Sequence, residues 1–311
     1  MIIDPDRPIT TSFPDDFLAL DAPLLDTRAP ELDLEPAALR QVLVIAFHRR
    51  TGSNLLCEDL RLTARAGVAR GYLDYAVLSD GPQPSGVRPL TWSRISLPSP
   101  SLRGRMGQLR RRLEGRDYWH NTTQFAPGQV ASYLRQLVGY RTTPNGVFAL
   151  KVRFDQWQHL LVESGAVRVF GDVPLRFIML TREDEVAQAI SSVRAMQNST
   201  WIQVGPTTPR GRYDPDAITS ALEEIRVARE GWESTFIERG IEPIRIAYES
   251  FVSDRHGTVA GVISALEGSD VASFEQRALS SMIRQADLQN AQWRERYLAE
   301  YPASSARAGG G

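Results

Sequence analysis

The residues Val42-Leu-Val-Ile-Ala-Phe-His-Arg-Arg-Thr-Gly-Ser-Asn-Leu-Leu56 contain the features that decide the fold of this chain. An apolar run over 41–47 has the length of a strand, and such an uninterrupted run suits a central parallel strand covered on both faces. A short polar loop follows, and residues 55–66 then have a helical pattern that Gly67 ends. The segment therefore predicts a strand, a tight loop and a helix in direct succession.

The rest of the chain continues this alternation of strands and helices. Further strands are expected over 147–152, 175–181 and 244–248, and further helices over 184–198, 216–239 and 258–266. Strands that alternate with helices imply a parallel sheet with helices on both faces. We therefore predict an α/β fold with a central, mostly parallel sheet flanked by helices.

The chain is expected to have one main domain, 39–302, with a segment at each end. Residues 1–38 are predicted to be an acidic extension, partly ordered or draped on the surface. Its aspartates are Asp4, Asp6, Asp15, Asp16, Asp21, Asp26 and Asp33. A disordered tail is expected over 303–311. Residues 76–128 are irregular, and their arginine cluster is interpreted as a solvated helix face, with contact to an anionic acceptor as the alternative.

The composition narrows the possible functions. The 311 residues have a formal net charge of −1, which gives no general attraction for nucleic acid or anionic membranes. Cys57 is the only cysteine, which excludes an intramolecular disulfide and a metal site built from cysteines. The start of the chain lacks the pattern of a secretory signal, and no apolar run approaches the roughly 20 residues that span a bilayer. We therefore expect a cytoplasmic protein.

Lysine is almost absent from the chain. Among the 36 Lys and Arg residues, Lys151 is the only lysine. A chain that uses arginine nearly everywhere keeps a lysine where a compact, mobile charge is needed and a planar guanidinium does not fit. Lys151 is therefore a candidate functional residue, with chance survival as the alternative.

The loop after the first strand has the composition of an anion-binding site. The helix that follows presents unpaired N–H groups and the positive end of its dipole at its first turn. Gly52 allows close approach of the backbone, Arg50 adds a permanent charge, and three polar side chains add hydrogen bonds: Thr51, Ser53 and Asn54. The loop lacks the G-x-x-x-x-G-K-[ST] pattern of ATP-binding P-loops. An ordinary helix cap is the alternative, because Ser, Thr and Asn are favoured there.

Four segments of the chain resemble, in order, the motifs of one enzyme family. Residues 50–56 resemble the 5′-phosphosulfate loop of the bacterial Stf0-type sulfotransferases, and 145–152 resemble their short strand with a lysine near its end. Residues 180–195 resemble the 3′-phosphate motif of the family, and 284–297 resemble its C-terminal loop and last helix. The resemblance does not include the acidic extension.

This resemblance implies a sulfotransferase that uses 3′-phosphoadenosine-5′-phosphosulfate (PAPS) as co-substrate and releases adenosine 3′,5′-bisphosphate (PAP). It also implies a P-loop-like, three-layer α/β fold, a homodimer and no metal. The acceptor is expected to be a hydroxyl group of a carbohydrate, a glycolipid or a glycosylated metabolite, with neither nucleic acid nor stable membrane insertion involved. The alternatives are a non-catalytic nucleotide-binding scaffold and, less favoured, a nucleotide-dependent kinase.

The resemblance assigns residues to the two charged ends of PAPS. The loop of residues 50–54 is expected to bind the phosphosulfate. Arg182 ends a strand and Ser191 lies on the following helix, and the resemblance implies that both bind the ribose 3′-phosphate at the carboxyl edge of the sheet. Arg284 is expected to close over the same phosphate. A surface salt bridge with a neighbouring acidic residue is the alternative role of Arg182.

Sulfuryl transfer needs in-line attack, positive charge near the leaving oxygen and a base that takes the hydroxyl proton. Arg50 and Lys151 are the predicted cations. The resemblance places Asp74 where the family has a catalytic glutamate, so Asp74 is the predicted base. An ordinary loop carboxylate is the alternative interpretation of Asp74, and His48 or His120 is the alternative base.

The tryptophans are divided between core and acceptor contacts. Trp92 and Trp119 lie in the irregular middle region and are the candidates for stacking on an acceptor. Trp201, Trp232 and Trp293 are expected in the core or at an interface.

Overall fold

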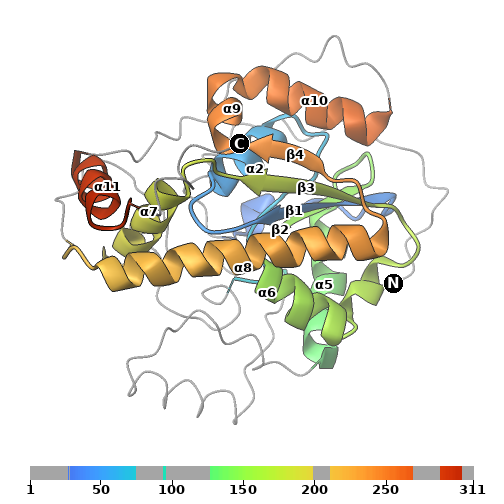
Figure 1. Cartoon of the computed structure of the whole chain (residues 1–311). Helices are drawn as coiled ribbons and strands as arrows, with labels where there is room; N and C mark the ends of the chain where they lie inside the picture. The colour runs from blue at the N-terminus through green and yellow to red at the C-terminus, as the bar shows by residue number, and fades with distance from the viewer. Residues whose placement is uncertain are drawn as a thin grey trace.

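The core of the protein is a parallel β-sheet. The computed structural model describes residues 27, 29–74, 94–95, 127–198, 211–268 and 288–302. Within these residues the sheet comprises β1 (Gln41–Phe47), β2 (Val147–Val152), β3 (Leu175–Thr181) and β4 (Ile244–Ala247), in the order β2-β1-β3-β4. Each neighbouring pair is parallel (Figure 1). The predicted α/β fold with a parallel sheet is confirmed.

Helices cover both faces of this sheet (Figure 1). The described helical segments are η2 (Pro30–Leu32), α2 (Ser53–Leu62), α5 (Pro127–Arg141), α6 (Phe154–Gln156), η5 (Trp157–Glu163), η6 (Ala166–Phe170), α7 (Glu185–Asn198), α8 (Pro215–Arg239), α9 (Tyr248–Ser253), α10 (Arg255–Glu267) and α11 (Leu288–Glu300). One face packs against α5, η5 and α8, and the other against α2, α9 and α10. Within the described ranges, no helix combines the length and the apolar character needed to cross a membrane.

Strand β1 contributes to both cores, because successive side chains of a strand point to opposite faces. Val42 and Val44 belong to the core under α5 and α8. Leu43 and Ile45 belong to the core under α2 and α10. All four side chains are fully buried, and this double burial explains why the apolar run in the sequence is continuous rather than alternating.

Two helices start two or three residues earlier than expected, and the first of them, α2, also ends at Leu62 instead of at residue 66. Helix α2 begins at Ser53, and α10 begins at Arg255. In α10 the carboxylate of Asp254 accepts a hydrogen bond from the N–H of Gly257 (2.8 Å), so a side-chain cap allows the earlier start. Strand β4 is one residue shorter than expected because α9 begins at Tyr248.

The last residues of the predicted acidic extension pack against the domain. Asp33 forms a buried ion pair with Arg141 of α5 (2.7 Å), and the carbonyl of Ala29 accepts a hydrogen bond from the same guanidinium (3.0 Å). Most of residues 1–38 and all of the tail 303–311 lie outside the described residues. The expected division into extension, domain and tail therefore stays a prediction.

Two tryptophans are buried as expected. Trp232 of α8 packs against the sheet, and Trp293 of α11 packs against α7 and α8. Trp92, Trp119 and Trp201 lie outside the described residues, so a stacking role for the first two stays a prediction.

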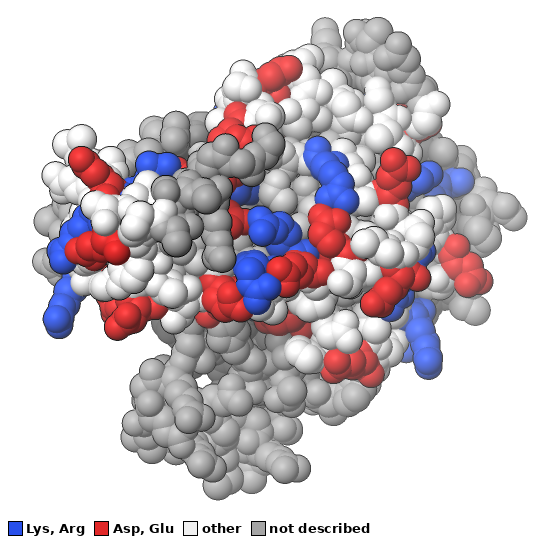
Figure 2. Space-filling view, in the orientation of Figure 1, with Lys and Arg blue, Asp and Glu red and all other residues white. Residues whose placement is uncertain are grey.

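Charged side chains of both signs are mixed on the face of the molecule that carries α8 (Figure 2). Arg226 pairs with Glu223 and Glu230, and Arg245 pairs with Glu233. Exposed pairs of this kind contribute little stability, because water screens them. Because acidic and basic groups are mixed on this face, its described residues do not form a basic surface for a polyanion.

Candidate active site

Most of the predicted site residues lie at the carboxyl edge of the sheet. Arg50 follows β1, Lys151 is near the end of β2, and Arg182 follows β3 directly. Because these strands are parallel, their carboxyl ends meet at one edge, where open α/β sheets bind ligands. The topology therefore gathers side chains that are far apart in the sequence.

The loop between β1 and α2 is shaped by two residues with positive φ. Arg50 has φ 67°, and Gly52 has φ 79°. A Cβ atom on Gly52 would lie 2.5 Å from Cδ2 of Tyr248, so a side chain at this position is excluded by conformation and by space. The Oγ1 of Thr51 donates a hydrogen bond to the carbonyl of His48 (2.8 Å) and closes the turn.

Gly52 is also the N-cap of α2. Glycine has no side chain that could accept a hydrogen bond from the first N–H groups of the helix, whereas a Ser, Thr or Asn cap would do so. The ordinary side-chain cap considered from the sequence is therefore not formed at this position. The first turn of α2, which begins with Ser53, presents its N–H groups to the loop side, as an anion site requires.

Arg50, Arg182 and Ser191 are brought together at this loop. Nε of Arg50 donates to Oγ of Ser191 (2.9 Å), and Nη1 of Arg182 donates to the carbonyl of Arg50 (3.4 Å). Burial, followed by the nearby charge of Arg182, lowers the pKa of Arg50 to about 10. Arg50 is still protonated at neutral pH, so two permanent positive charges lie side by side.

This proximity differs from what the sequence predicts for the two ends of the donor. Arg50 was assigned to one end of the donor and Ser191 to the other, yet the two side chains are hydrogen-bonded. The predicted phosphosulfate and 3′-phosphate positions therefore adjoin each other across Arg50. Arg182 also lies 3.8 Å from Glu249 and stacks over Tyr248, so its acidic neighbour comes from α9 rather than from the adjacent residues.

Lys151 is buried and joins β2 to the loop. Its Nζ donates a hydrogen bond to Oδ1 of Asn54 in the first turn of α2. The same ammonium lies 5.1 Å from the ring centroid of Phe47, a distance typical of a cation–π contact. The single lysine of the chain is therefore part of the candidate site.

Asp74 lies next to Lys151. A Cβ atom on Gly71 would lie 2.0 Å from Oδ2 of Asp74 and 3.1 Å from Cε of Lys151, so both side chains flank the same point. Oδ1 of Asp74 accepts hydrogen bonds from Nη1 of Arg153 (2.9 Å) and Nε2 of Gln156 (3.0 Å). The two donors therefore fix the position of the Asp74 carboxylate, and both bind its Oδ1 atom.

Arg153 and Gln156 were not singled out from the sequence. Burial lowers the pKa of Arg153, but the carboxylates of Asp155 and Asp74 outweigh this effect, and the pKa of Arg153 lies above its usual value. The sequence offered one signal for Arg153, which is its position. Arg153 lies two residues beyond Lys151 and leaves the sheet at the same edge.

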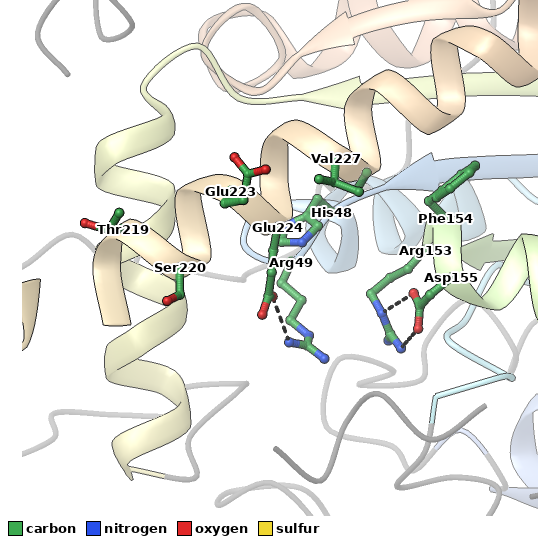
Figure 3. Close-up of a pocket in the computed structure, with 11 residues that line it drawn as sticks. His48, Arg49, Arg153, Phe154, Asp155, Thr219, Ser220, Glu223, Glu224 and Val227 are labelled. Carbon is green, nitrogen blue, oxygen red and sulfur yellow. Dashed lines mark hydrogen bonds and ion pairs between the residues drawn. The ribbon is translucent and has the colours of Figure 1, made fainter. Parts of the chain in front are cut away.

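His48 is a poor base at neutral pH. Burial, and then the charge of Arg49, lowers the pKa of His48 to about 4. Its ring borders a cavity beside the site (Figure 3). His120 and Arg284, which were also considered from the sequence, lie outside the described residues.

Glu58 of α2 anchors the segment that leads to Asp74. Its carboxylate accepts hydrogen bonds from Arg61 (2.6 Å) and from Arg70 (2.8 Å) and is almost fully buried. Burial raises the pKa of Glu58, but the two guanidiniums reverse this effect and hold it below its usual value. Glu58 is therefore a structural ion-pair partner.

The chain is similar to known proteins along most of its length. The model of the Stf0 sulphotransferase family matches residues 42–300. The trehalose 2-sulfotransferase of Mycolicibacterium smegmatis is 31% identical over 273 residues, which cover 82% of this chain and 93% of that protein. The trehalose 2-sulfotransferase of Mycobacterium tuberculosis is 30% identical over 281 residues, which cover 85% of this chain and 97% of that protein.

Proposed function

Because the chain belongs to the Stf0 sulphotransferase family, we propose that it transfers a sulfuryl group from PAPS to a hydroxyl group of a carbohydrate. Membership in the family confirms the family resemblance and the sulfotransferase activity predicted from the sequence motifs. The choice of PAPS as donor rests on the resemblance of the four motifs and on the charges at the sheet edge.

One observation supports the proposed donor site. Arg50 lies between Arg182 and Ser191, next to a helix start whose N-cap is Gly52. Guanidiniums bind phosphate and sulfate oxygens through parallel N–H bonds, and the N–H groups of a helix start add further donors. This arrangement supports the binding of a ligand with two closely spaced anionic groups. The assignment of Arg284 to the same ligand stays a prediction.

The reaction exchanges one sulfur–oxygen bond for another. The acceptor oxygen attacks sulfur in line, the bond to the bridging oxygen of the nucleotide breaks, and negative charge develops on that oxygen. Arg50 and Lys151 stabilise this charge. Asp74 takes the proton of the attacking hydroxyl, and Oδ2 is the oxygen assigned to it because Oδ1 already accepts two hydrogen bonds.

A carbohydrate acceptor is supported by the relatives, both of which are named trehalose 2-sulfotransferases. Trehalose is therefore the first acceptor to test. The homodimer expected from the family resemblance and the cytoplasmic location expected from the sequence stay predictions.

The test separates donor binding from transfer. Isothermal titration calorimetry with PAP is expected to show saturable binding to the folded protein, and labelled sulfate is expected to pass from PAPS to trehalose or another neutral sugar. Binding of PAP without transfer to any glycan would identify a nucleotide-binding scaffold, and binding of MgATP in place of PAP would identify a kinase. Absence of PAP binding by folded protein contradicts the proposed donor.

A further inference from the structure

The described end of the acidic extension packs against α5, although it lies before the part of the chain that the family model matches. That match begins at residue 42. Ala29, Leu32 and Leu34 are almost fully buried. The N–H of Leu34 also donates a hydrogen bond to the carbonyl of Tyr140 in α5 (2.8 Å). The family motifs assign no role to residues 29–34, so their contacts have to indicate it.

Asp33 supplies the countercharge of a buried arginine, Arg141 at the end of α5. Oδ1 of Asp33 accepts a hydrogen bond from Nε of Arg141 (2.9 Å) and lies 2.7 Å from Nη2, and the two side chains are 2% and 0% exposed. Nη1 and Nη2 donate to the carbonyls of Thr27 (3.3 Å) and Ala29 (3.0 Å). Each nitrogen of this guanidinium therefore donates to an atom of the extension, which fixes its position.

The same guanidinium lies beside Tyr72, a fully buried residue close to the proposed base. Cζ of Arg141 is 5.9 Å from the centroid of the Tyr72 ring. Burial raises the pKa of Tyr72 despite this nearby charge, so its hydroxyl stays protonated and donates to the carbonyl of Val68 (2.5 Å). The hydroxyl of Tyr133 in α5 donates to the carbonyl of Tyr72 (3.2 Å), and the Tyr72 ring stacks on Phe148 of β2. Tyr72 is therefore fixed through both its backbone and its ring.

Tyr72 lies inside the turn that ends at Asp74. The N–H of Asp74 donates to the carbonyl of Gly71 (3.0 Å) and closes this turn. The carbonyl of Arg70, just before the turn, accepts a hydrogen bond from the N–H of Lys151 (3.1 Å). Residues 67–74, which we call the base segment, therefore set the position of Asp74 relative to Lys151. A misplacement of a reacting group by about 1 Å can lower a rate roughly 100-fold.

Loss of the Asp33 charge would be felt first at Tyr72. A buried guanidinium without its countercharge is strongly unfavourable, and it either moves or draws water into its surroundings. Because the Tyr72 ring lies against Arg141, either change disturbs the packing that holds the base segment.

We propose that Asp33 is a positioning residue for the sulfuryl transfer, which acts through Arg141 and Tyr72 to hold the base segment so that Asp74 reaches the attacking hydroxyl group. The proposal rests on the proposed function, and it gives the end of the acidic extension a role in catalysis that lies outside the family motifs.

The matched pair of variants Asp33→Asn and Asp59→Asn tests this role. Asp59 of α2 is also a fully buried aspartate, and it pairs with Arg255 of α10 (2.6 Å) on the other face of the sheet. Both variants therefore lose one charge of a buried ion pair, but only one of these pairs lies next to the base segment. Urea unfolding measures the loss of stability in each, and transfer is measured where circular dichroism shows both variants to be folded.

We expect Asp33→Asn to lower kcat for transfer from PAPS to trehalose at least about tenfold, because the base is displaced. KM for PAPS and the affinity for PAP are expected to stay within about twofold of wild type, because the donor loop is not part of the contact. Asp59→Asn is expected to keep kcat within about twofold of wild type at a similar loss of stability.

Hydrogen–deuterium exchange provides a readout that needs no turnover. We expect amide exchange over residues 67–74 to become at least about threefold faster in Asp33→Asn, because local opening of the base segment becomes easier. In Asp59→Asn the exchange over 67–74 is expected to match wild type, and the faster exchange is expected in α2 and α10 instead.

A double-mutant cycle with Tyr72→Leu tests the path through Tyr72. If Asp33 acts through this ring, Asp33→Asn lowers kcat by less than about twofold in the Tyr72→Leu background, since the two changes interrupt the same path. Multiplied losses of kcat contradict the path. Should Tyr72→Leu fail to fold, the exchange over 67–74 in Asp33→Asn decides the proposal.

The outcomes separate this proposal from the proposed function. Unchanged exchange over 67–74 in Asp33→Asn overturns the positioning role even in a protein that transfers no sulfate. Equal losses of kcat in Asp33→Asn and Asp59→Asn overturn it as well, because general loss of stability then explains both. Failure of PAP binding to wild type contradicts the donor and leaves the exchange measurement valid.

Discussion

Two groups of cations lie at the same edge of the sheet and differ in their hydrogen-bond partners. On the proposed donor side, Arg50 donates to the hydroxyl of Ser191, and Lys151 donates to the amide oxygen of Asn54. These two hydrogen-bond acceptors carry no charge, whereas Arg182 on the same side lies 3.8 Å from the carboxylate of Glu249. A cation held by neutral partners keeps its field available to an anionic ligand.

On the other side, around the proposed base Asp74, the cations lie next to carboxylates. Arg153 is hydrogen-bonded to Asp74 and Asp155, and Arg49 lies 3.9 Å from Glu224. Such a guanidinium fixes the position of its carboxylates and leaves little net charge. Arg49 and Arg50 are adjacent in the sequence, yet they belong to opposite sides, so the surroundings rather than the residue type decide what an arginine does here.

The largest expected effect comes from removing a donor-side cation. Arg50→Ala is expected to lower transfer by at least about 10³-fold and to weaken PAP binding by roughly 10- to 100-fold, because a charge-assisted hydrogen bond contributes about 1.5–3 kcal/mol. Calorimetry with PAP and transfer of labelled sulfate measure the two effects. Arg49→Gln is the control and is expected to change PAP affinity less than twofold. Equal loss of PAP affinity in both variants contradicts the division into two sides.

A stability effect is expected at Glu58, which pairs with the buried Arg61 and the partly buried Arg70 and belongs to neither side. Glu58→Gln is expected to destabilise the fold by about 3 kcal/mol at pH 7, because one partner of a buried ion pair is lost. Glu267→Gln, at an exposed pair with Arg65, is expected to cost less than about 1 kcal/mol. Urea unfolding measures both.

The pH dependence of this difference has a definite sign. The pKa of Glu58 is lower in the folded protein than its ordinary value of 4.5. The stabilisation is therefore fully present above pH 4.5 and is lost as the pH falls through the folded pKa. The gap between wild type and Glu58→Gln should narrow at low pH, and a gap that widens there would contradict the lowered pKa.

Asp74→Asn tests the role of Asp74, which lies next to Lys151 of one group and is hydrogen-bonded to Arg153 of the other. Loss of the base is expected to reduce kcat by roughly 10²-fold while PAP affinity stays within twofold of wild type. Asp172→Asn, an exposed carboxylate in the turn before β3, is expected to leave both quantities unchanged. Turnover near the wild-type level in Asp74→Asn moves the base to another residue.

The smallest effect is expected at His48. Since its pKa is about 4, the ring does not titrate between pH 5.5 and 8. His48→Gln is therefore expected to leave the shape of the pH–rate profile in that range unchanged. Loss of a titration step from the profile would identify His48 as the base instead of Asp74.

The sheet was predictable because its strands are buried on both faces. The strands at 41–47, 147–152 and 175–181 have the boundaries read from the sequence, since a doubly covered strand leaves a continuous apolar run. The helix starts were less predictable. The start of α10 depends on the Asp254 side chain. The start of α2 depends on Gly52, which packs directly against the ring of Tyr248.

The candidate site was predictable only in part. The motifs named the loop residues 50–54, Lys151 and Asp74, and the structure places these together at one edge. The motifs did not name Arg153 or Gln156, because each gains a role through a contact with a residue about eighty positions away.

The sequence by itself determined the order of strands and helices, the position of the loop proposed to bind the anion and the family, because these depend on local pattern and short motifs. The tertiary structure decided which cations are neutralised by carboxylates and which residues line the cavity next to Arg153. The physical reason is that charge pairing and cavity shape depend on distances between side chains, and the parallel packing of β1, β2 and β3 sets those distances.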